Sequence, residues 1–376
     1  MIIIQLFLQG IVAFLIGTLL YDIVHYLFHI FLRSKNKILK KIGGIHLSHH
    51  RFFPPNLKFN SKLTNMNLLH HVVVEYITQF IGTSLCFFFF SSLAVWLAIL
   101  LESLIFLAVL HWKGIDPHHK SYANLPVNQG GMFVSSAYHA LHHIYPTNFF
   151  SGYIKLLDYL LGTAQQLKNK RIALTGASGA LGSNMKIVLE KEGAIVIPIK
   201  FGIDYDDQHY DKLNNILSKI DILFLCHGSK YENTQQANCD SFIRIIELFK
   251  SVKKPGLIPI EIWAVGSEIE CHPCFGIKSL YAYAKSKRNF AQYARGYFHD
   301  AHIHYKHIVH SAFTSRMGPG LMSARFAARA TLFLIKRGFK YVPVSYTGFA
   351  FLNYFIFIYA PKKYATIEND SVQPLK

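Results

Sequence analysis

Acidic residues are scarce in this sequence of 376 residues, which has 21 Asp and Glu against 39 Lys and Arg. The formal net charge is therefore +18 with histidine neutral. A basic balance of this size is typical of nucleic-acid binding, but 51% of the residues are hydrophobic, which is too apolar for that class. We therefore expect no nucleic-acid partner. A membrane protein with a basic cytosolic face accounts for both the charge and the apolar content.

Cysteine is also sparse, with five residues that lie scattered along the chain. An odd, scattered set does not form the disulfide framework of a small secreted protein, so we expect a reducing compartment. Cys271 and Cys274 have CxxC spacing, but no second pair accompanies them. We interpret them as part of a substrate loop and not as a zinc or redox site.

Long hydrophobic runs, in contrast, fill the first third of the chain. The run over residues 2–31 can cross a bilayer and lacks a signal-peptide cleavage site. The run over residues 72–110 is nearly twice as long as one span and predicts a hairpin of two helices that turns near Ser91 and Ser92. Eight Lys and Arg residues lie between Arg33 and Lys62. The positive-inside rule places this loop in the cytosol and predicts an integral membrane protein with three spans and an external N-terminus.

Histidine is concentrated on the predicted cytosolic side of these spans. Of 21 histidines, 13 fall between His25 and His143. Spacings of i, i+3 and i, i+4 place side chains on one helix face, so each group presents converging imidazoles. The grouped histidines are His25, His29, His46, His49, His50, His111, His139, His142 and His143. Nine imidazoles exceed the four ligands of one structural zinc and suit two metal ions with open positions.

The order of these boxes resembles the fatty acid hydroxylase/sterol desaturase superfamily. The pattern is HxxxH, HxxHH, a single histidine and a final HxxHH followed by "IYPTNFFSGYIKLLDYLLGT", over about residues 10–165. The resemblance implies a membrane-embedded centre of two iron ions that activates O2 and hydroxylates or desaturates a lipid. It carries the nine histidines over as ligands, with His111 at the single-histidine position. His70, His71, His118 and His119 fit no box. Asp22 lies three residues before His25 and could orient its imidazole.

The second half begins with a nucleotide-binding pattern. The segment "RIALTGASGALGSNMKIVLEKEGAIVIPIK" predicts a strand, a glycine turn, a helix and a second strand. Gly176, Gly179 and Gly182 permit a tight turn and a close approach of backbone N–H groups to a pyrophosphate at the helix N-terminus, beside Ser178. Lys200 follows the second strand, where a cation favours a 2′-phosphate, so we expect NADP(H) before NAD(H).

These elements and the segments after them resemble the short-chain dehydrogenase/reductase family, over about residues 169–345. The resemblance assigns the catalytic set to Asn238, Ser267, Tyr283 and Lys287. Tyrosine and lysine at i, i+4 share one helix face, and the ammonium lowers the pKa of the phenol. The pair Tyr281 and Lys285 has the same spacing and stays open as an alternative.

Two departures from the family pattern bear on the activity. The family's NNAG is replaced by Leu225, Cys226, His227 and Gly228, of which Gly228 keeps a cofactor-binding position. The usual Pro-Gly after the sixth strand of the family is replaced by His310 and Ser311.

The expected architecture is therefore an all-α transmembrane histidine-box domain followed by an α/β Rossmann-type domain with a doubly wound parallel sheet. The expected boundaries are residues 1–165, residues 169–345 and a membrane-associating C-terminal tail over residues 346–376.

The expected function is O2-dependent hydroxylation or desaturation of a membrane lipid, coupled to NAD(P)(H)-dependent alcohol/carbonyl interconversion. The expected electron donor is a ferredoxin or cytochrome b5 type protein. The alternatives are fatty aldehyde or wax-type chemistry, a second domain that binds nucleotide without turnover, and a zinc protein without oxygen chemistry.

Overall fold

The computed structural model describes residues 2–127, 131–254, 256–368 and 371–374, and it divides into two compact units. Unit 1 comprises Met1–Ala123 and Gly131–Gln165, and unit 2 comprises Asn124–Gly130 and Gln166–Lys376. The short segment that begins at Asn124 clusters with unit 2, and the backbone N–H of Leu125 donates to the carbonyl of Leu257.

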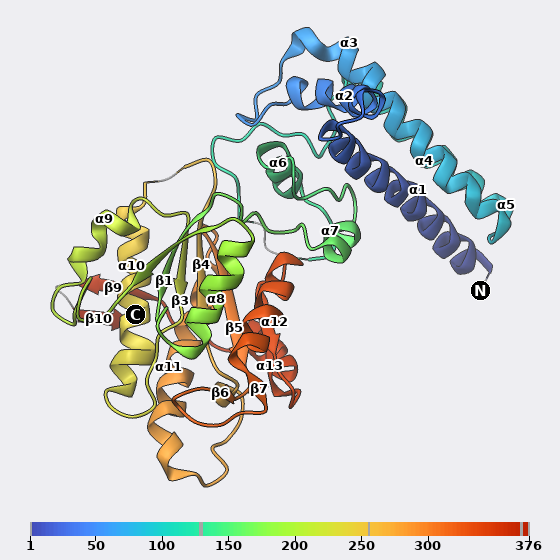
Figure 1. Cartoon of the computed structure of the whole chain (residues 1–376). Coiled ribbons are helices and arrows are strands. Elements are labelled where there is room, and N and C mark those ends of the chain that lie inside the picture. The colour runs from blue at the N-terminus through green and yellow to red at the C-terminus, as the bar shows by residue number, and fades with distance from the viewer. Residues whose placement is uncertain (1, 128–130, 255, 369–370, 375–376) are drawn as a thin grey trace. The chain divides into compact units, whose positions relative to one another are not determined.

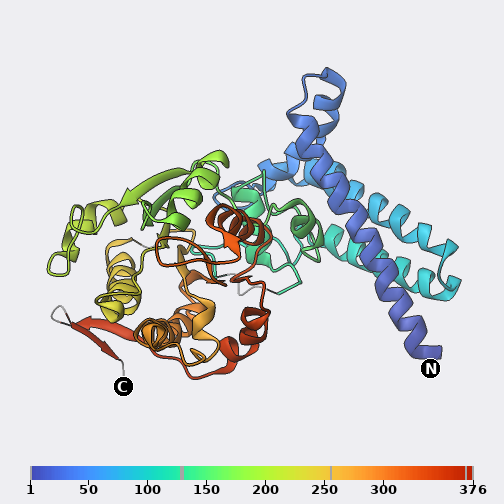
Figure 2. The same ribbon diagram turned by 60° about the horizontal axis from the view of Figure 1, so that its bottom comes forward.

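Unit 1 is built from long apolar helices (Figures 1 and 2). They are α1 (Ile2–Leu32), a helical run over Ser61–Phe88 that contains α4 (Val73–Leu85), and α5 (Ser92–His111). All three are long and apolar enough to cross a membrane. The hairpin turns between Phe88 and Ser92, where the Ser91 hydroxyl accepts a hydrogen bond from the Ala94 N–H and caps α5. The prediction of three membrane-spanning helices is confirmed at this level of length and composition.

The run over Ser61–Phe88 is not a uniform α-helix. A 3-10 turn (Ser61–Leu63), α3 (Thr64–Asn67) and a π-helical segment (Leu68–Val72) precede α4, and a 3-10 turn (Cys86–Phe88) follows it. The π-helical segment carries His70 and His71. Such segments rotate the following side chains relative to an α-helix and occur frequently at functional sites.

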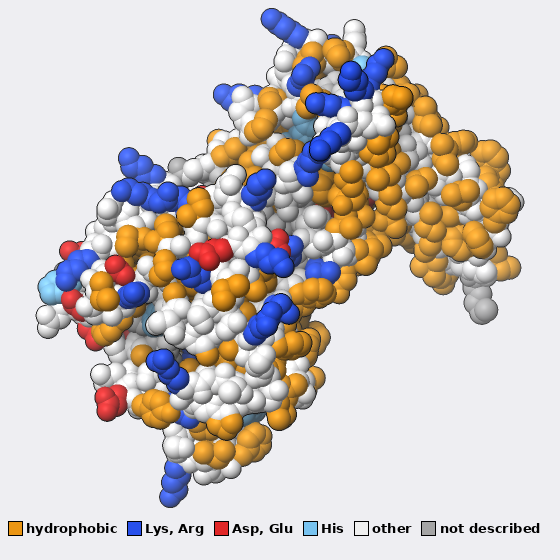
Figure 3. Space-filling model, viewed as in Figure 1, with side chains coloured by type: hydrophobic (Ala, Val, Ile, Leu, Met, Phe, Trp, Pro, Cys, Tyr) orange, Lys and Arg blue, Asp and Glu red, His pale blue; other side chains and the backbone are white. Residues whose placement is uncertain are grey.

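Shorter helices complete unit 1 at one end of the long helices. They are α2 (Lys37–Phe52), α6 (Ser136–Ile144) and α7 (Leu156–Leu161). Asn36 caps α2 by accepting from the N–H groups of Ile38 and Leu39, and Ser135 caps α6 by accepting from the Tyr138 N–H. Figure 3 shows hydrophobic side chains over the long helices and Lys and Arg side chains around the end that carries α2 and α3.

The long helices pack closely around a buried carboxyl group. Glu102 on α5 is buried and accepts a hydrogen bond from the Thr83 hydroxyl on α4 at 2.5 Å. A Cβ added at Gly17 on α1 would lie 2.7 Å from Glu102 Oε1, so glycine permits this approach. The Glu102 carboxyl group therefore faces the inside of the helix bundle, as expected because an ionisable group in contact with lipid is energetically unfavourable.

Unit 2 is a doubly wound parallel sheet with the strand order β2-β1-β3-β4-β5-β8. The strands are β1 (Arg171–Thr175), β2 (Ile195–Ile199), β3 (Ile222–Leu225), β4 (Ile260–Val265), β5 (Ile303–His310) and β8 (Tyr341–Val344). β1 pairs in parallel with both β2 and β3, which places the topological switch point at its carboxyl end. Ligands of open α/β sheets bind in the crevice at such a point. The predicted architecture of helical domain and Rossmann-type domain is confirmed.

Helices cover both faces of this sheet (Figure 1). One face packs against α8 (Ala180–Lys191) and α12 (Ala324–Lys336), and the other packs against α10 (Ser241–Val252), α11 (Tyr281–His299) and α13 (Phe349–Tyr359). A 3-10 turn (Tyr210–Leu213) and α9 (Asn214–Leu217) connect β2 to β3. A π-helical turn (Gln236–Asp240) precedes α10, and 3-10 turns (Glu268–Glu270 and Lys278–Leu280) precede α11.

Two small strand pairs lie outside the main sheet. β6 (Phe313–Thr314) pairs with β7 (Met322–Ser323), and β9 (Ala365–Glu368) pairs with β10 (Ser371–Pro374). The expected C-terminal tail thus begins with a helix that packs on unit 2, because Ala350, Asn353 and Phe357 of α13 are buried there.

Candidate metal centre and nucleotide site

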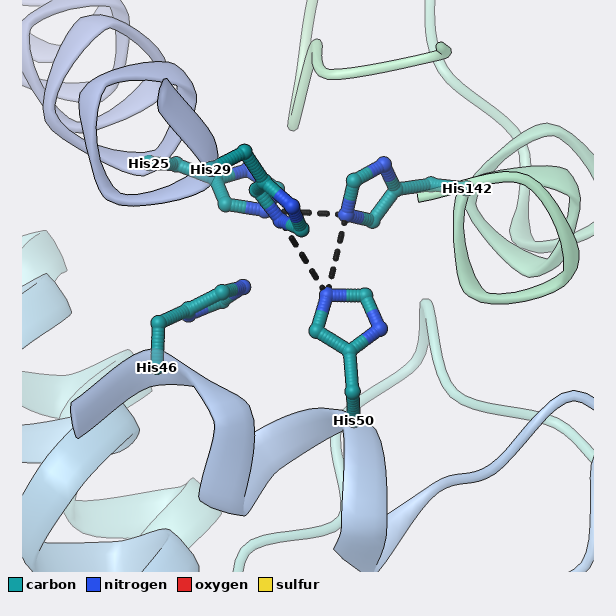
Figure 4. Close-up of side chains that lie close together, drawn as sticks. All are labelled: His25, His29, His46, His50 and His142. Carbon is teal, nitrogen blue, oxygen red and sulfur yellow. Dashed lines mark hydrogen bonds between the residues drawn. The ribbon is translucent and has the colours of Figure 1, made fainter. Parts of the chain in front are cut away.

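Five histidines of the first group converge from three helices (Figure 4). α1 supplies His25 and His29, α2 supplies His46 and His50, and α6 supplies His142. One nitrogen from each ring lies within 4.8 Å of the others. The Nε2 atoms of His25 and His142 are 3.0 Å apart, and those of His29 and His50 are 3.2 Å apart.

A second group of four histidines lies in the same unit. Its members are His49, His119, His139 and His143. The Nε2 atom of His119 is 3.2 Å from that of His49, 3.2 Å from that of His143 and 3.0 Å from that of His139. All four side chains are buried, so this group forms a pocket of imidazole nitrogens shielded from water.

The hydrogen bonds behind these rings determine which nitrogen faces each centre. His25 Nδ1–H donates to the carbonyl of Phe150, and His142 Nδ1–H donates to the carbonyl of Asn148. In the second group, Asn67 Oδ1 accepts from His49 Nδ1 and the Asp116 carboxylate accepts from His119 Nδ1. A neutral imidazole carries one proton, so in these four residues Nε2 presents its lone pair to the centre.

Lone pairs at 3.0–3.2 Å with no proton between them repel one another, and a cation at each centre removes this repulsion. Burial lowers the pKa of His142 to about 4, and it lowers the pKa of His49 and His143 well below the usual value. These rings are therefore neutral at pH 7, which is the form that binds a metal. The donor set consequently fits two metal ions, one for each group.

The structure places eight of the nine predicted ligands in these two groups. The exception is His111, which lies exposed at the end of α5 and belongs to neither group. The second group contains His119, a residue outside the predicted set, so the structure brings His119 and not His111 to the candidate metal site. Asp116 orients this ring through backbone and side-chain contacts: it accepts from the N–H of His119 and from its Nδ1 at 2.9 Å. An Asp three residues before a His in "DPHH" was the available signal.

Of the other histidines without a box, His71 lies near the second group without joining it. Its ring stacks on that of His49 with centroids 3.5 Å apart, and its Nδ1 accepts from the Tyr21 hydroxyl at 2.9 Å. His71 thus packs behind a member of the second group. Asp22 is hydrogen-bonded to another segment and not to His25: its Oδ1 accepts from the backbone N–H of Gly152 at 2.8 Å.

The segment after the last histidine box forms a loop that orients two rings of the first group. The buried Asp158 carboxylate accepts from the N–H groups of Phe150 and Ser151 and from the Tyr138 hydroxyl. Asn148 Nδ2 donates to the carbonyls of Thr163 and Gln165. Between them, Phe149 has a left-handed φ of 61°, a strained conformation for a bulky residue. These contacts aim the carbonyls of Asn148 and Phe150 at His142 and His25.

In unit 2, the glycine turn joins β1 to the N-terminus of α8. Gly176 has a φ of +67°, and a Cβ added at Gly182 would lie 2.1 Å from the Gly176 carbonyl oxygen. Ser178 and Gly179 are exposed, and Gly179 provides no side-chain cap for α8. The first N–H groups of this helix are therefore available to a pyrophosphate. Lys200 is exposed directly after β2, the neighbour of β1.

His227, which stands where the family pattern NNAG has a different residue, contacts two neighbouring elements. Its Nδ1 lies 2.7 Å from the Thr175 hydroxyl on β1, and its Nε2 lies 2.8 Å from the Ser241 hydroxyl on α10. The ring thus ties the end of β3 to two neighbouring elements. Gly228 follows, and a Cβ there would lie 2.5 Å from Asn238 Oδ1 and 4.0 Å from Lys287 Nζ.

Asn238 and Lys287 are both buried beside this turn. Asn238 Nδ2 donates to the carbonyls of Ser229 and Thr234, and Lys287 Nζ donates to the carbonyl of Val265 at 2.9 Å. Burial lowers the pKa of Lys287 to about 8. The lysine thus lies at the end of β4, where the next residues lead to Ser267.

The orientation of α11 distinguishes Tyr283 from the alternative, Tyr281. Tyr283 packs against Ile269 and Ala284, and burial raises its pKa while the hydrogen-bonding Ser267 side chain lowers it. Tyr281 is 52% exposed. Tyr283, Lys287 and Ser267 therefore form one site with Asn238 behind it, and Tyr281 and Lys285 lie on the outside of the helix.

Sequence reasoning missed a buried polar pair behind Ser267. Glu270 Oε1 is 2.8 Å from His307 Nε2 on β5, and Glu270 Oε2 accepts from the backbone N–H of Ser267. Glu270 also completes the capping box of the 3-10 turn that Ser267 caps. His310, which with Ser311 replaces the usual Pro-Gly, has its Nε2 2.7 Å from the Thr331 hydroxyl.

No family model matches the chain. The monoglucosyldiacylglycerol epimerase of Synechocystis sp. is 28% identical over 265 residues, which cover 60% of this chain and 63% of that protein. The chain thus spans less than two thirds of the length of this relative.

Among solved structures, the chain is similar to RhlG of Pseudomonas aeruginosa in its NADP complex, with 18% identity and a TM-score of 0.40 over 49% of this chain and 98% of that one. It is also similar to a short-chain dehydrogenase of Burkholderia cenocepacia in complex with NADP, with 15% identity and a TM-score of 0.38 over 52% and 97%.

The fold and the residues define a protein with two candidate sites. A helical unit with two histidine groups, and with three helices long and apolar enough to cross a membrane, is followed by a unit with the parallel sheet and glycine turn of a Rossmann-type fold.

Proposed function

We propose that unit 2 is an NADP(H)-dependent oxidoreductase that interconverts an alcohol and a carbonyl on a membrane lipid. The observation that carries this proposal is the site formed by Ser267, Tyr283 and buried Lys287 at the carboxyl end of β4. The glycine turn at Gly176 and exposed Lys200 lie at the carboxyl ends of the neighbouring strands, where they fit a dinucleotide with a 2′-phosphate.

The residues of this site divide the proton chemistry between them. NADP+, when bound, supplies the acceptor for the hydrogen that leaves the carbinol carbon with its electron pair. Tyr283 in its phenolate form takes the hydroxyl proton and becomes the neutral phenol, and the Lys287 ammonium one helical turn away stabilises the phenolate before this transfer. Ser267 donates a hydrogen bond to the substrate oxygen and holds it beside Tyr283. In the reverse direction Tyr283 returns the proton to the carbonyl oxygen.

Epimerisation of a glycolipid sugar is the specific reaction that we favour, because a relative of this chain is a monoglucosyldiacylglycerol epimerase. Oxidation of one sugar hydroxyl to a ketone, rotation of the ketone in the site and reduction on the opposite face would invert that carbon without net redox change. The membrane helices of unit 1 are consistent with a substrate that resides in a bilayer.

The test is turnover of monoglucosyldiacylglycerol by the full-length protein with NADP+ in D2O. We expect an epimer without deuterium at the inverted carbon, because the cofactor carries that hydrogen. Deuterium at this carbon would show inversion by proton abstraction and would contradict the proposal. NADPH binding without turnover of any lipid alcohol or aldehyde would favour the nucleotide-binding docking module instead.

We further propose that unit 1 binds two iron ions, one for each histidine group, and hydroxylates or desaturates a lipid. When bound, iron would supply O2 activation, and the chain would provide nine imidazoles in two groups. Electrons would come from a ferredoxin or cytochrome b5 type protein. Metal analysis of the purified protein should give about two irons per chain. Zinc in place of iron would favour the rival without oxygen chemistry.

The proposed orientation places the end of unit 1 with the basic loop in the cytosol. Its support is the run of Lys and Arg between Arg33 and Lys62, together with the three apolar helices. Asn60 is exposed in this loop. An Asn60→Cys variant in intact cells should react with a permeant maleimide only, and reaction with an impermeant one would overturn the orientation.

A further inference from the structure

We propose that α13 and the loop between Ser267 and Tyr283 form one lipid-docking surface that seats the mouth of the oxidoreductase site in an anionic bilayer. This inference rests on the proposed function of unit 2. It adds how a substrate whose acyl chains stay in the membrane reaches Tyr283. We define the docking surface by Phe275, Ile277 and Lys278 of the loop and by Leu352, Phe355, Tyr359, Lys362 and Lys363 at the C-terminal side.

The two faces of α13 differ in their environment. Ala350, Asn353 and Phe357 pack into unit 2, and the Phe357 ring stacks on that of His307 with centroids 4.6 Å apart. The opposite face presents Leu352, which is 68% exposed, and Phe355, which is 63% exposed. The inner face already anchors the helix, so the large outer side chains are not required for folding. Exposed aromatic and aliphatic side chains on a short helix are typical of helices that lie in a membrane interface.

The loop continues this apolar surface toward the site. The His272 ring lies 5.2 Å from the ring of Phe275 and 5.2 Å from that of Phe349, the first residue of α13. Phe275 and Ile277 are exposed. Cys274, one residue earlier, is buried against the cluster that includes Tyr283. The loop therefore has one side against the catalytic tyrosine and the other side exposed beside α13.

The charges of this surface identify the occupant. Lys278, Lys285, Lys362 and Lys363 are all exposed. Residues 271–285 and 349–364 contain no Asp or Glu. Lysines that flank exposed aromatic residues, with no acid among them, match a bilayer with anionic headgroups. The three apolar helices of the same chain tether unit 2 to a membrane, so this surface meets lipid at a high effective concentration.

The consequence is a route for the substrate that avoids water. A glycolipid headgroup can enter beside the loop while its acyl chains remain in the bilayer. The expected behaviour is that damage to the docking surface impairs turnover of bilayer lipids but spares a water-soluble short-chain glycolipid with the same headgroup.

The experiment uses the full-length protein in vesicles that contain anionic lipid. The test variant is Leu352→Glu with Phe355→Glu, and the matched control is Ile187→Glu, which changes an exposed residue of α8 outside the docking surface. We expect the test variant to lose about tenfold or more in turnover of the long-chain glycolipid. It should keep turnover of the short-chain glycolipid and NADPH binding, and the control should resemble the unmodified protein. Equal loss with both substrates would overturn the docking surface.

A direct readout separates this inference from the proposed function. In a Phe355→Trp variant, lipids with brominated acyl chains should quench the additional tryptophan fluorescence relative to the unmodified protein. Absence of this additional quenching would contradict the docking surface even if the enzyme is active. Quenching in a protein that turns over neither substrate would support the docking surface and contradict the proposed function.

Discussion

The two units build their sites in different ways. In unit 1, the histidines of the candidate metal site come from helices and a loop that are far apart in the chain. His25 and His142 are an example, and hydrogen bonds to other segments orient their rings. In unit 2, the site residues lie at the carboxyl ends of adjacent parallel strands or on the helix that follows them. The comparison shows that local spacing reveals strand-end sites well, whereas a converging metal centre depends on contacts that only the tertiary structure supplies.

The largest expected effect separates the two units by metal content. A His142→Ala variant should lose most of its bound iron, because His142 contributes one of the five nitrogens of its group. A His111→Ala variant is the matched control and should keep its iron, since His111 is exposed outside both groups. Metal analysis with NADPH titration checks both variants. Loss of iron from the control together with full occupancy in His142→Ala would reverse the ligand assignment.

The second prediction concerns NADPH binding at the glycine turn of unit 2. A Gly182→Ala variant places a Cβ against the Gly176 carbonyl and should weaken NADPH binding by about tenfold or more. Gly256→Ala adds a methyl group where nothing lies within 4 Å and should bind normally. Fluorescence titration measures both constants. Unchanged affinity in Gly182→Ala would place the pyrophosphate away from this turn, while iron content should be unaffected in either variant.

A smaller effect concerns the choice of cofactor. Lys200 is exposed after β2, so a Lys200→Glu variant should lose about tenfold in affinity for NADPH relative to NADH. The matched control is Lys191→Glu, at the far end of α8. The ratio of the two dissociation constants is the measurement. A ratio that does not change in Lys200→Glu would remove this residue from the phosphate site.

The smallest expected effect is the pH dependence of the oxidoreductase. Burial lowers the pKa of Lys287 to about 8, so its ammonium is charged at pH 7 and loses its proton above that value. Burial also raises the pKa of Tyr283, which keeps the phenol protonated as the acid for carbonyl reduction. The value of kcat/KM for reduction should therefore fall above about pH 8. A Lys287→Arg variant that remains active should show this fall in kcat/KM at higher pH. If the fall stays at the same pH in this variant, a group other than Lys287 causes it.

Particular residues show which features can be predicted from the sequence and which need the tertiary structure. The glycine turn, the buried strands and the order of helices follow from periodicity, because each depends on neighbours in the chain. Three helices of membrane-spanning length were likewise predicted from their apolar runs. The sequence does not place His119 in the candidate metal site, because this residue lies in a loop without helical spacing and its position depends on Asp116 and on contacts with α2 and α6. The buried pair of Glu270 and His307 joins two elements that sequence spacing does not connect.

The choice between Tyr281 and Tyr283 likewise cannot be made from sequence spacing alone. Tyr281 and Tyr283 satisfy the same spacing, and only the packing of α11 distinguishes the exposed residue from the one beside Ser267. Helical geometry places them about 200° apart around the axis, so one site cannot use both.

The central claim is that Tyr283 performs the proton transfer in alcohol and carbonyl interconversion on a lipid. The most direct test compares NADP(H)-linked turnover of the lipid substrate by the full-length Tyr283→Phe and Tyr281→Phe variants, with NADPH binding measured in parallel. We predict that Tyr283→Phe loses about 10²–10⁴-fold in turnover with nearly unchanged NADPH binding, while Tyr281→Phe keeps most activity. Loss of turnover in Tyr281→Phe with normal activity in Tyr283→Phe would contradict the account.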